Sequence, residues 1–457
     1  MPLPPVIEIV PLTSPVRAEI TVPGSKSITN RALILAALAD GRTTLRGALW
    51  SEDTQVMTDC LRALGFTVDV QPDPAESCNR TLTVDGLGGR LPRAGTAAQP
   101  LELFVGNAGT AARFLAAMVC LGDGVYRLSG VPRMHERPQA ALFAALRELG
   151  YRVESERGDD KLPARIFGAS RNPKPGIPNC RVSVTESSQF ASALLLSGGV
   201  GGWQVEITGA NEDELPYVDM TRELVKVFPD NGGEFQIEPD ASSGSYFSGI
   251  GWLLPNDPIP NPLNPVGKPW VKPSITLFMP GTVRQEDAKF TNFFQHPPHI
   301  HRSQKEMGEV GDSISRASDL ADSIMTAIVL APFASTPTRF TDLGRLRVQE
   351  CERVVALRTE LTKCGAKVIE EGDTLTVFPS ALHGAEIETY DDHRMAMCFA
   401  VLGLKVPGIK IKHPACVKKT FPNFFQKLAT PPPHGLGAEI RDAATGRKLA
   451  LEELFAD

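Results

Sequence analysis

The chain has 457 residues, more than one hydrophobic core comfortably serves, so two domains are expected. Its hydrophobic content of 42% and charged content of 22% are ordinary for a globular enzyme. A net charge of −6 argues against nucleic-acid and membrane partners, so any anion site must be a local basic pocket.

The apolar and cysteine patterns indicate a cytoplasmic protein. No apolar run approaches the roughly 20 residues that span a bilayer. The eight Cys are scattered with no Cys-x-x-Cys, which suits reduced thiols. The Pro-rich start of the chain, residues 1–15, lacks the Arg- and Ser-rich amphipathic character of a transit peptide.

The first informative motif joins a strand to a helix. A strand-like run over residues 17–22 meets a Pro-Gly turn, and an Ala/Leu-rich helix follows over residues 28–38. Such a junction presents free backbone N–H groups and the positive end of a helix dipole to an anion. Lys26 adds an ammonium, Ser27 a hydroxyl and Arg31 a guanidinium that suits phosphate or carboxylate. The alternative is a capped helix with solvated Lys and Arg.

One pattern recurs along the chain: an amphipathic helix, a Gly and a short β-branched strand. The Gly supplies the left-handed cap that ends a helix. Six such units, three per domain, would account for the length, although helix–Gly–strand is also common in other α/β proteins. The clear copies are centred on Gly65, Gly150, Gly233 and Gly365, and weaker candidates are residues 288–294 and 422–428.

Two segments in the middle of the chain predict irregular structure. Residues 254–273 are rich in Pro, Asn and Gly, which favours neither helix nor central strand. Residues 295–303 contain His-Pro-Pro-His-Ile-His, which invites a metal interpretation. The intervening Pro residues break helical ligand spacing, so we expect an exposed insertion and no metal site.

Two further helix starts in the first half suit an anionic ligand. Gly106 to Thr110 form a small-residue turn in which Asn107 and Gly109 let a ligand approach the backbone, with Arg133 in a later loop. Ser187-Ser188-Gln189 precedes another Ala/Leu helix, and a plain N-cap explains only one of these Ser. Tyr217 lies just ahead of the following helix.

The second half supplies carboxylates and more cations. Asp319 and Asp322 precede an apolar helix over residues 323–330, and a role as the helix N-cap would be enough to explain either residue. The pattern places Arg347, Glu350, Arg353 and Arg358 along one helix, with an ion pair between Glu350 and Arg353 as the simplest role.

A charged stretch opens the next helix with His393 and Arg394, and Lys419 precedes the last helix. Together the cations exceed the need of one phosphate and suit two polyanionic substrates held between domains. Asp322 and Glu350 would then transfer protons in a basic pocket.

These motifs resemble 5-enolpyruvylshikimate-3-phosphate synthase, in the family's order and over most of residues 6–250 and 312–428. The matching runs are Pro-Gly-Ser-Lys-Ser-x-x-Asn-Arg, Gly-Asn-Ala-Gly-Thr-Ala-x-Arg, Ser-Ser-Gln-Phe, Asp-Asp-His-Arg-Met-Ala-Met and Lys-Thr-Phe-Pro. Phe114, where bacterial and plant forms usually carry Pro, resembles the fungal synthase domain of the pentafunctional arom polypeptide, whose adjacent domains would then be partners.

The resemblance implies an α/β fold, a two-domain inside-out α/β barrel of the enolpyruvyl transferase type with three helix–sheet repeats per domain. The first domain would span residues 21–245. The second would combine residues 1–20 and 246–430, with an irregular insertion at about 250–311, and residues 431–457 would form a tail.

The resemblance also implies a reaction of the shikimate pathway to chorismate and the aromatic amino acids. The enolpyruvyl group of phosphoenolpyruvate moves to the 5-hydroxyl of shikimate 3-phosphate and phosphate is released, with no cofactor and no metal. Asp322 would take the hydroxyl proton, while Glu350 and Lys26 exchange protons at the enolpyruvyl carbon and the leaving phosphate.

The remaining site residues divide between the two substrates by the same resemblance. Cys416 and His393 would be neighbours of the site without a direct role. Phosphoenolpyruvate would be held by Lys26, Arg133, Arg353, Arg394 and Lys419, aided by Asn107, Gly109 and Gln189, and shikimate 3-phosphate by Ser27, Arg31, Ser187, Ser188, Gln189 and Tyr217.

Four departures from the family pattern raise the alternative of an impaired or inactive chain. Gln349 stands where the family has Lys near shikimate 3-phosphate, and Arg345 replaces Asn. Glu214 adds a negative charge where a Ser is usual, and the segment 250–311 replaces regular structure. A further alternative, UDP-N-acetylglucosamine enolpyruvyl transferase, would need a catalytic Cys loop and lacks the Asp-Asp-His-Arg-Met-Ala-Met run.

Overall fold

The computed structural model describes residues 3–14, 16–170, 176–209, 215–254, 271–274, 285, 290 and 313–456. Contacts divide the chain into two compact units. Unit 1 comprises Met1–Val22, Asp240–Thr276 and Glu286–Asp457, and unit 2 comprises Pro23–Pro239 and Leu277–Gln285. Each unit has its own apolar core, and no core residue is shared among those described.

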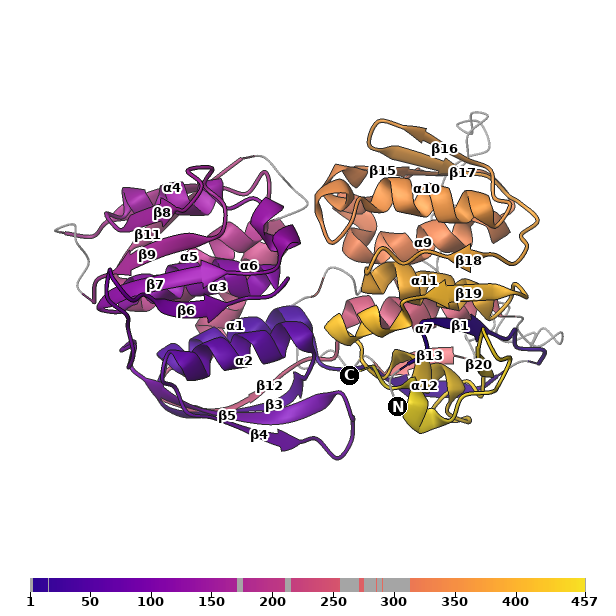
Figure 1. Cartoon of the computed structure of the whole chain (residues 1–457), viewed down its shortest axis with the longest axis horizontal. Helices are drawn as coiled ribbons and strands as arrows, with labels where there is room; N and C mark the ends of the chain where they lie inside the picture. The colour runs from indigo at the N-terminus through magenta and orange to yellow at the C-terminus, as the bar shows by residue number, and fades with distance from the viewer. Residues whose placement is uncertain are drawn as a thin grey trace, which may run out of the picture. The chain divides into compact units, whose positions relative to one another are not determined.

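Unit 2, indigo to magenta in Figure 1, contains two four-stranded sheets and one strand pair. The strands in sheet order are β12 (Gly233–Gln236), β3 (Asp40–Leu49), β5 (Asn79–Leu87) and β4 (Val68–Pro72); β6 (Leu101–Phe104), β7 (Gly124–Ser129), β9 (Ala164–Gly168) and β8 (Arg152–Ser155); and β10 (Asn179–Ser183) with β11 (Gln204–Thr208). The helices are α1 (Lys26–Leu38), α2 (Glu52–Ala63), α3 (Gly109–Met118), α4 (Ala140–Glu148), α5 (Ser188–Gly201) and α6 (Leu215–Val227).

Unit 1, mostly orange and yellow in Figure 1, has the same composition of sheets. Its strands in sheet order are β14 (Ser313–Ser315), β15 (Thr338–Thr341), β17 (Thr374–Val377) and β16 (Val368–Glu371); β18 (Glu386–Ile387), β19 (Ile409–Lys412), β1 (Val6–Ile9) and β20 (Ile440–Asp442); and β13 (Val271–Ser274) with β2 (Ala18–Thr21). The helices are α7 (Ala241–Leu253), α9 (Ile324–Leu330), α10 (Arg353–Lys363), α11 (His393–Gly403) and α12 (Phe424–Ala429).

All four of the four-stranded sheets share one pairing pattern. The first two strands in the sheet order are parallel and the next two pairings are antiparallel. Both strand pairs, β10–β11 and β13–β2, are parallel. The sheets therefore repeat one local topology, as the recurring helix–Gly–strand sequence predicts.

Three of the repeat glycines adopt the conformation that the pattern requires. Gly65, Gly150 and Gly365 have φ of 96°, 98° and 92°, which side chains with a Cβ rarely tolerate. Each donates its N–H to the carbonyl three residues earlier, at Arg62, Arg147 and Thr362, and so ends its helix. Gly233 differs, because α6 ends at Val227 and Gly233 is already the first residue of β12.

In each unit three largely buried helices form the centre. In α1 every residue from Ile28 to Leu38 is buried, and in α3 every residue is. Helix α5 packs against both. In unit 1 the helices α7, α9 and α11 contact one another in the same way. A helix without an exposed face belongs in a core, so helices lie inside and sheets cover them, as expected for an inside-out barrel.

The prediction of irregular structure over residues 250–311 is wrong for residues 250–253 and 271–274. Helix α7 continues to Leu253, and residues 271–274 form β13 with Pro273 inside it. Pro fits there because, among the described strands, β13 pairs with β2 alone, so a missing N–H need not interrupt a ladder. Most of the segment, with its His cluster and most of the weak candidate 288–294, lies outside the described residues, and so does Glu214.

The segment 431–457, expected to be a tail, contributes structure to unit 1. β20 pairs with β1, and the 3₁₀ turn η10 (Leu451–Leu454) follows it. Leu454 is 0% exposed, whereas Leu451 in the same turn is 40% exposed. The last residues therefore close one side of the unit 1 core.

Leu454→Ala should lower the free energy of unfolding of unit 1 by about 2–4 kcal/mol, because it leaves a cavity in a packed core. Leu451→Ala, the matched control in the same turn, should change it by less than about 0.5 kcal/mol. Denaturant unfolding of the full chain, followed by circular dichroism, compares the two. Equal effects would mean that residues 451–454 do not pack as described.

Candidate functional site

In unit 2, the Arg31 side chain connects its own helix, α1, to three other helices. Its Nε donates to Thr221 Oγ1 at 2.8 Å, and its Nη2 donates to Ser192 Oγ at 3.1 Å. Its guanidinium carbon lies 5.2 Å from the centre of the Phe114 ring. Arg31, Phe114, Ser192 and Thr221 each lie one to two turns after the start of α1, α3, α5 and α6, respectively. The N-terminal ends of these four helices therefore lie together.

The predicted anion-binding residues of unit 2 occupy these helix starts. Lys26 and Ser27 open α1, Gly109 opens α3 just after Asn107, and Ser188 and Gln189 open α5. Ser187 caps α5, since its Oγ accepts the Gln189 N–H at 3.3 Å. Four positive helix ends in one place favour an anion. Tyr217, expected just ahead of α6, lies instead in its first turn.

Lys26 has a carboxylate partner that the sequence did not indicate. Its Nζ lies 3.1 Å from Asp53 Oδ2, and the Asp53 side chain is 4% exposed. An Asp in the first turn of α2 suggests only dipole compensation. The contact depends on the packing of α1 against α2, which the sequence pattern does not reveal.

One further cation of unit 2 lies close to the start of α3. Arg137, which sequence reasoning missed, donates to the Asn107 carbonyl at 3.2 Å. Arg133, on the 3₁₀ turn η2 (Pro132–Glu136), pairs with Glu136 at 2.6 Å with both side chains well exposed.

Unit 1 contains a continuous network of charged and polar groups, here called the charged cluster. Asp322 Oδ1 accepts from Arg316 at 2.9 Å and from Gln349 Nε2 at 3.4 Å, and Asp322 Oδ2 lies 3.6 Å from Arg394. The charged cluster consists of Arg316, Asp322, Gln349, Glu350, Arg353, Asp392, Arg394 and Lys419.

Arg353 is the centre of this cluster and is 1% exposed. Its Nε donates to Asp392 Oδ2 at 2.6 Å, and its Nη2 lies 2.8 Å from Glu350 Oε2. Gln349 Oε1 accepts from its Nη1. Glu350 Oε1 then lies 3.2 Å from Lys419 Nζ, so one carboxylate bridges two cations. A buried guanidinium requires such partners, because an unpaired one would cost several kcal/mol, on the order of 3–5.

The charged cluster also joins helix starts. Asp392 caps α11 by accepting the Arg394 N–H at 2.9 Å, and Arg353 is the first residue of α10. Arg394 donates to Ser242 Oγ, at the start of α7, at 3.3 Å. Asp322 immediately precedes α9. The N-terminal ends of four helices therefore meet in unit 1, as they do in unit 2.

The prediction of one helix through residues 347–358 is wrong. α10 begins only at Arg353, where Glu352 caps it by accepting the Val355 N–H at 2.7 Å. Arg347 instead ends the 3₁₀ turn η8 (Leu343–Val348) and contacts Glu352, Glu370 and Asp373 at 2.7–2.8 Å. Gln349 and Glu350 thus lie in a connection, from which both reach Arg353.

The Asp322 carboxylate is ionised over the whole working pH range. Burial alone would raise the pKa of Asp322, but Arg394, Arg316 and Arg353 outweigh burial and hold that pKa well below its usual range. Its stabilising contribution is therefore present above the unfolded pKa of about 3.9 and is lost only as the pH falls through the lower folded pKa.

The predicted site neighbours lie beside the charged cluster. His393 follows the capping Asp392 and is buried at the start of α11. Burial, assisted by Asp392, raises the pKa of the Cys416 thiol, so Cys416 is a poor nucleophile. Cys351, absent from our predictions, donates its Sγ–H to Asp392 at 3.5 Å.

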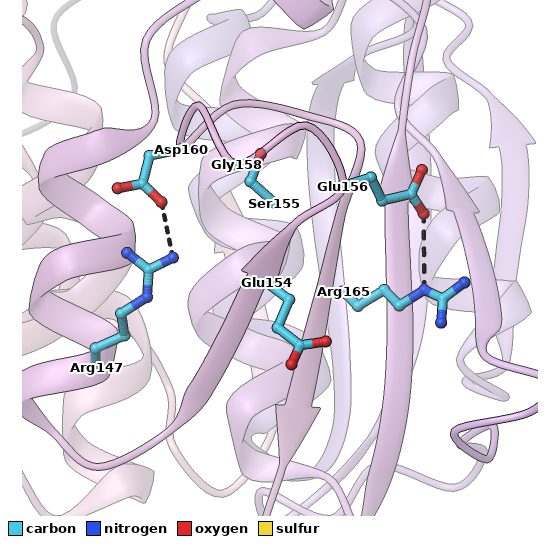
Figure 2. A pocket seen from close by; sticks show the side chains of 7 residues that line it. All are labelled: Arg147, Glu154, Ser155, Glu156, Gly158, Asp160 and Arg165. Carbon is cyan, nitrogen blue, oxygen red and sulfur yellow. Dashed lines mark hydrogen bonds and ion pairs between the residues drawn. The ribbon is translucent and has the colours of Figure 1, made fainter.

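A pocket of about 550 Å³ in unit 2 includes none of the predicted site residues (Figure 2). Arg147 and Asp160 form an ion pair of 2.7 Å at one side of it, and Arg165 and Glu156 one of 3.7 Å at the other. Its lining residues include two Arg and the three carboxylates of Glu154, Glu156 and Asp160, so the pocket does not offer the excess of cations that an anionic substrate requires. In the described residues no helix is long and apolar enough to cross a membrane, and no cluster of His, Cys, Asp or Glu is arranged to hold a metal ion.

Comparisons with known proteins agree with this arrangement. Residues 10–428 match the family model described as EPSP synthase (3-phosphoshikimate 1-carboxyvinyltransferase). The 3-phosphoshikimate 1-carboxyvinyltransferases of Opitutus terrae and a Nostoc species are each 36% identical, covering 94% and 92% of this chain and 98% of each relative. EPSP synthase from Acinetobacter baumannii has a TM-score of 0.63 at 20% identity, covering 95% of this chain and 99% of that one. The enolpyruvyl transferase NikO from Streptomyces tendae has a TM-score of 0.64 at 17% identity, covering 98% and 100%.

A strained turn presents Asp392 to Arg353. Tyr390 and Asp391 have φ of 55° and 52°, a conformation that costs a residue with a Cβ on the order of 1–3 kcal/mol. The fully buried Glu360 holds this turn, because it accepts the Tyr390 hydroxyl at 2.8 Å and the Glu388 N–H at 3.1 Å.

Tyr390→Phe should lower the free energy of unfolding by about 1 kcal/mol, because it removes a hydrogen bond to a buried carboxylate. Tyr126→Phe is the matched control: the Tyr126 hydroxyl is buried and has no hydrogen-bond partner among the described residues, so its loss should be neutral or slightly stabilising. Denaturant titration measures both. A Tyr390→Phe protein as stable as the parent would contradict the role of Glu360.

Proposed function

The chain belongs to the EPSP synthase family, and we propose that it transfers the enolpyruvyl group of phosphoenolpyruvate to the 5-hydroxyl of shikimate 3-phosphate. The observation that carries the proposal is the meeting of four helix starts with Lys and Arg side chains in each unit. Both substrates carry phosphate and carboxylate groups, and positive helix ends beside guanidinium groups suit such anions.

In the addition step, the 5-hydroxyl oxygen forms a bond to C2 of phosphoenolpyruvate while Asp322 accepts the hydroxyl proton. The methylene carbon C3 receives a proton, which gives a tetrahedral ketal. We assign the proton exchange at C3 and at the leaving phosphate to Glu350 and Lys26. A substrate anion can replace Asp53 beside Lys26, and it can compete with Glu350 for the cation Lys419. In the elimination step C3 returns a proton, the bond from C2 to the phosphate oxygen breaks, and phosphate leaves with the net proton that the hydroxyl gave up.

The proposed division of binding residues follows the two units. In unit 1, Arg353, Arg394 and Lys419 hold phosphoenolpyruvate, and Gln349 lies beside Asp322 on the side of the acceptor substrate. In unit 2, Lys26 and Arg133 contribute to phosphoenolpyruvate with Asn107, Gly109 and Gln189, and shikimate 3-phosphate is held by Ser27, Ser187, Ser188, Gln189 and Tyr217.

For Arg31 the structure suggests a mainly indirect contribution to shikimate 3-phosphate binding. Its side chain is 2% exposed and donates to Thr221, Ser192 and the Ser27 carbonyl. These bonds hold the helix starts in place, while the positive charge of Arg31 adds to the potential there. Arg31 thus acts by keeping Ser27 and Ser188 in position.

The finer assignment to the fungal arom type has no support from the relatives, which are bacterial enzymes. The residue behind that assignment, Phe114, is fully buried with the Arg31 guanidinium over its ring. Its aromatic side chain has a packing role that does not depend on neighbouring domains. Adjacent domains therefore remain outside the proposal.

Phosphate release should require shikimate 3-phosphate and phosphoenolpyruvate together, and UDP-N-acetylglucosamine should not replace the former. Asp322→Asn should lower kcat by about 10²–10⁴-fold, because it removes the proton acceptor. Asp319→Asn is the matched control, since Asp319 lies three residues earlier, in the preceding turn, and bonds only Ser315 and Ser318 among the contacts described. Phosphate release from neither acceptor would indicate an inactive family member and overturn the proposal.

Gln349→Lys should lower KM for shikimate 3-phosphate by roughly tenfold, because a charged hydrogen bond contributes about 1.5–3 kcal/mol. Gln349 now bridges Asp322 and Arg353, and an ammonium at this place could also bind a substrate anion. Steady-state kinetics of Gln349→Lys, with Gln349→Met as the uncharged control, measure this change in KM. An unchanged KM in Gln349→Lys would show that the departure from the family pattern does not weaken binding.

A further inference from the structure

We propose that Arg316 is a positioning residue that keeps Asp322 ionised and oriented while the substrates bind. This inference rests on the proposed function, in which Asp322 accepts the hydroxyl proton. Arg316 belongs to none of the motifs in the sequence that resemble the family, and only the structure brings it to the charged cluster.

The geometry of the two counterions of Asp322 is asymmetric. Arg316 Nη2 donates to Asp322 Oδ1 at 2.9 Å, and the Arg316 side chain is 2% exposed. Arg394 lies farther away, at 3.6 Å from Oδ2, and is 13% exposed. The closer partner is thus enclosed in the protein, while the more distant one lies nearer to the solvent.

The backbone between the two residues is shaped to make this contact. Arg316 opens a short π-helical turn, η5 (Arg316–Leu320), and Asp322 lies in the following 3₁₀ turn, η6 (Ala321–Ser323). Between them Ala321 has φ 47° and ψ −132°, a conformation disfavoured for a residue with a Cβ. This turn brings the Asp322 carboxylate back to a side chain six residues earlier.

Substrate binding changes the interactions of Arg394, the more exposed of the two cations. In the proposed function Arg394 binds phosphoenolpyruvate, so its charge is then shared between the substrate and Asp322. The substrate anions would also favour protonation of a nearby carboxylate. Arg316, being enclosed, keeps its bond to Oδ1 throughout, so Asp322 stays ionised and a lone pair remains directed at the acceptor hydroxyl.

The test compares Arg316→Gln, which keeps a donor but removes the charge, with Arg316→Lys, which keeps the charge. Arg358→Gln is the control for loss of a cation in unit 1, because Arg358 is exposed and pairs with Glu370. The pH profile of kcat reports the ionisation of Asp322 in the substrate complex.

In Arg316→Gln the acid limb of the kcat profile should move up by about 1–3 pH units, because a neighbouring cation lowers a carboxylate pKa by that amount. At neutral pH kcat should fall roughly tenfold or more through loss of orientation, with each KM within about threefold of the parent value. Arg316→Lys should recover most of the parent profile, and Arg358→Gln should retain all of it. A lower kcat with an unmoved acid limb, or equal losses in Arg316→Gln and Arg316→Lys, would overturn the proposal.

A second measurement needs no activity. Carbon-13 NMR of protein labelled at the Asp side-chain carboxyl groups identifies Asp322 as the resonance lost in Asp322→Asn. The pKa of the Asp322 carboxyl group should be well below about 3.9 in the parent and higher in Arg316→Gln. An ordinary titration in the parent overturns the proposal even if Arg316→Gln does not fold. A low titration in a parent that releases no phosphate would instead reject only the proposed function.

Discussion

In each unit, the hydrogen bonds that a buried guanidinium makes to several segments of the chain organise the structure. Arg31 and Arg353 are 2% and 1% exposed, and each lies where the starts of several helices meet. Because a guanidinium has five donors in a fixed plane, it can fill its needs only from several directions. Arg31 donates hydrogen bonds to hydroxyls and a carbonyl on three helices. Arg353 donates to carboxylates and to an amide oxygen of neighbouring segments.

Both units place a buried Arg where helix starts meet, but the groups that contact this Arg differ between the units. In unit 2 the described hydrogen-bond acceptors of Arg31 are two hydroxyls and a carbonyl, and its charge adds to the positive helix ends. In unit 1 the partners of Arg353 are acidic, and the charged cluster contains four cations and three carboxylates, counted from Arg316, Arg353, Arg394 and Lys419 against Asp322, Glu350 and Asp392. Unit 1 therefore holds the groups suited to proton transfer, whereas unit 2 holds mainly groups suited to binding.

Much of the fold followed from local patterns. The glycines at 65, 150 and 365 end helices because only a residue without a Cβ adopts their φ cheaply, and this rule needs no tertiary information. The helices rich in Ala and Leu lack a polar face and are buried in the centre of each unit. The segment around Pro273 was misjudged, because strand neighbours decide whether a missing N–H matters.

The sequence by itself determined the family and most of the helix starts, with the start of α10 as an exception, since caps, turns and helix dipoles are properties of adjacent residues. Only the tertiary structure decided the partners: Asp53 for Lys26, Asp392 for Arg353 and Arg316 for Asp322. The physical reason is that ion pairs act through space at about 3 Å. Their members come from turns and helices whose approach depends on the packing of the core, and no spacing along the chain encodes that approach.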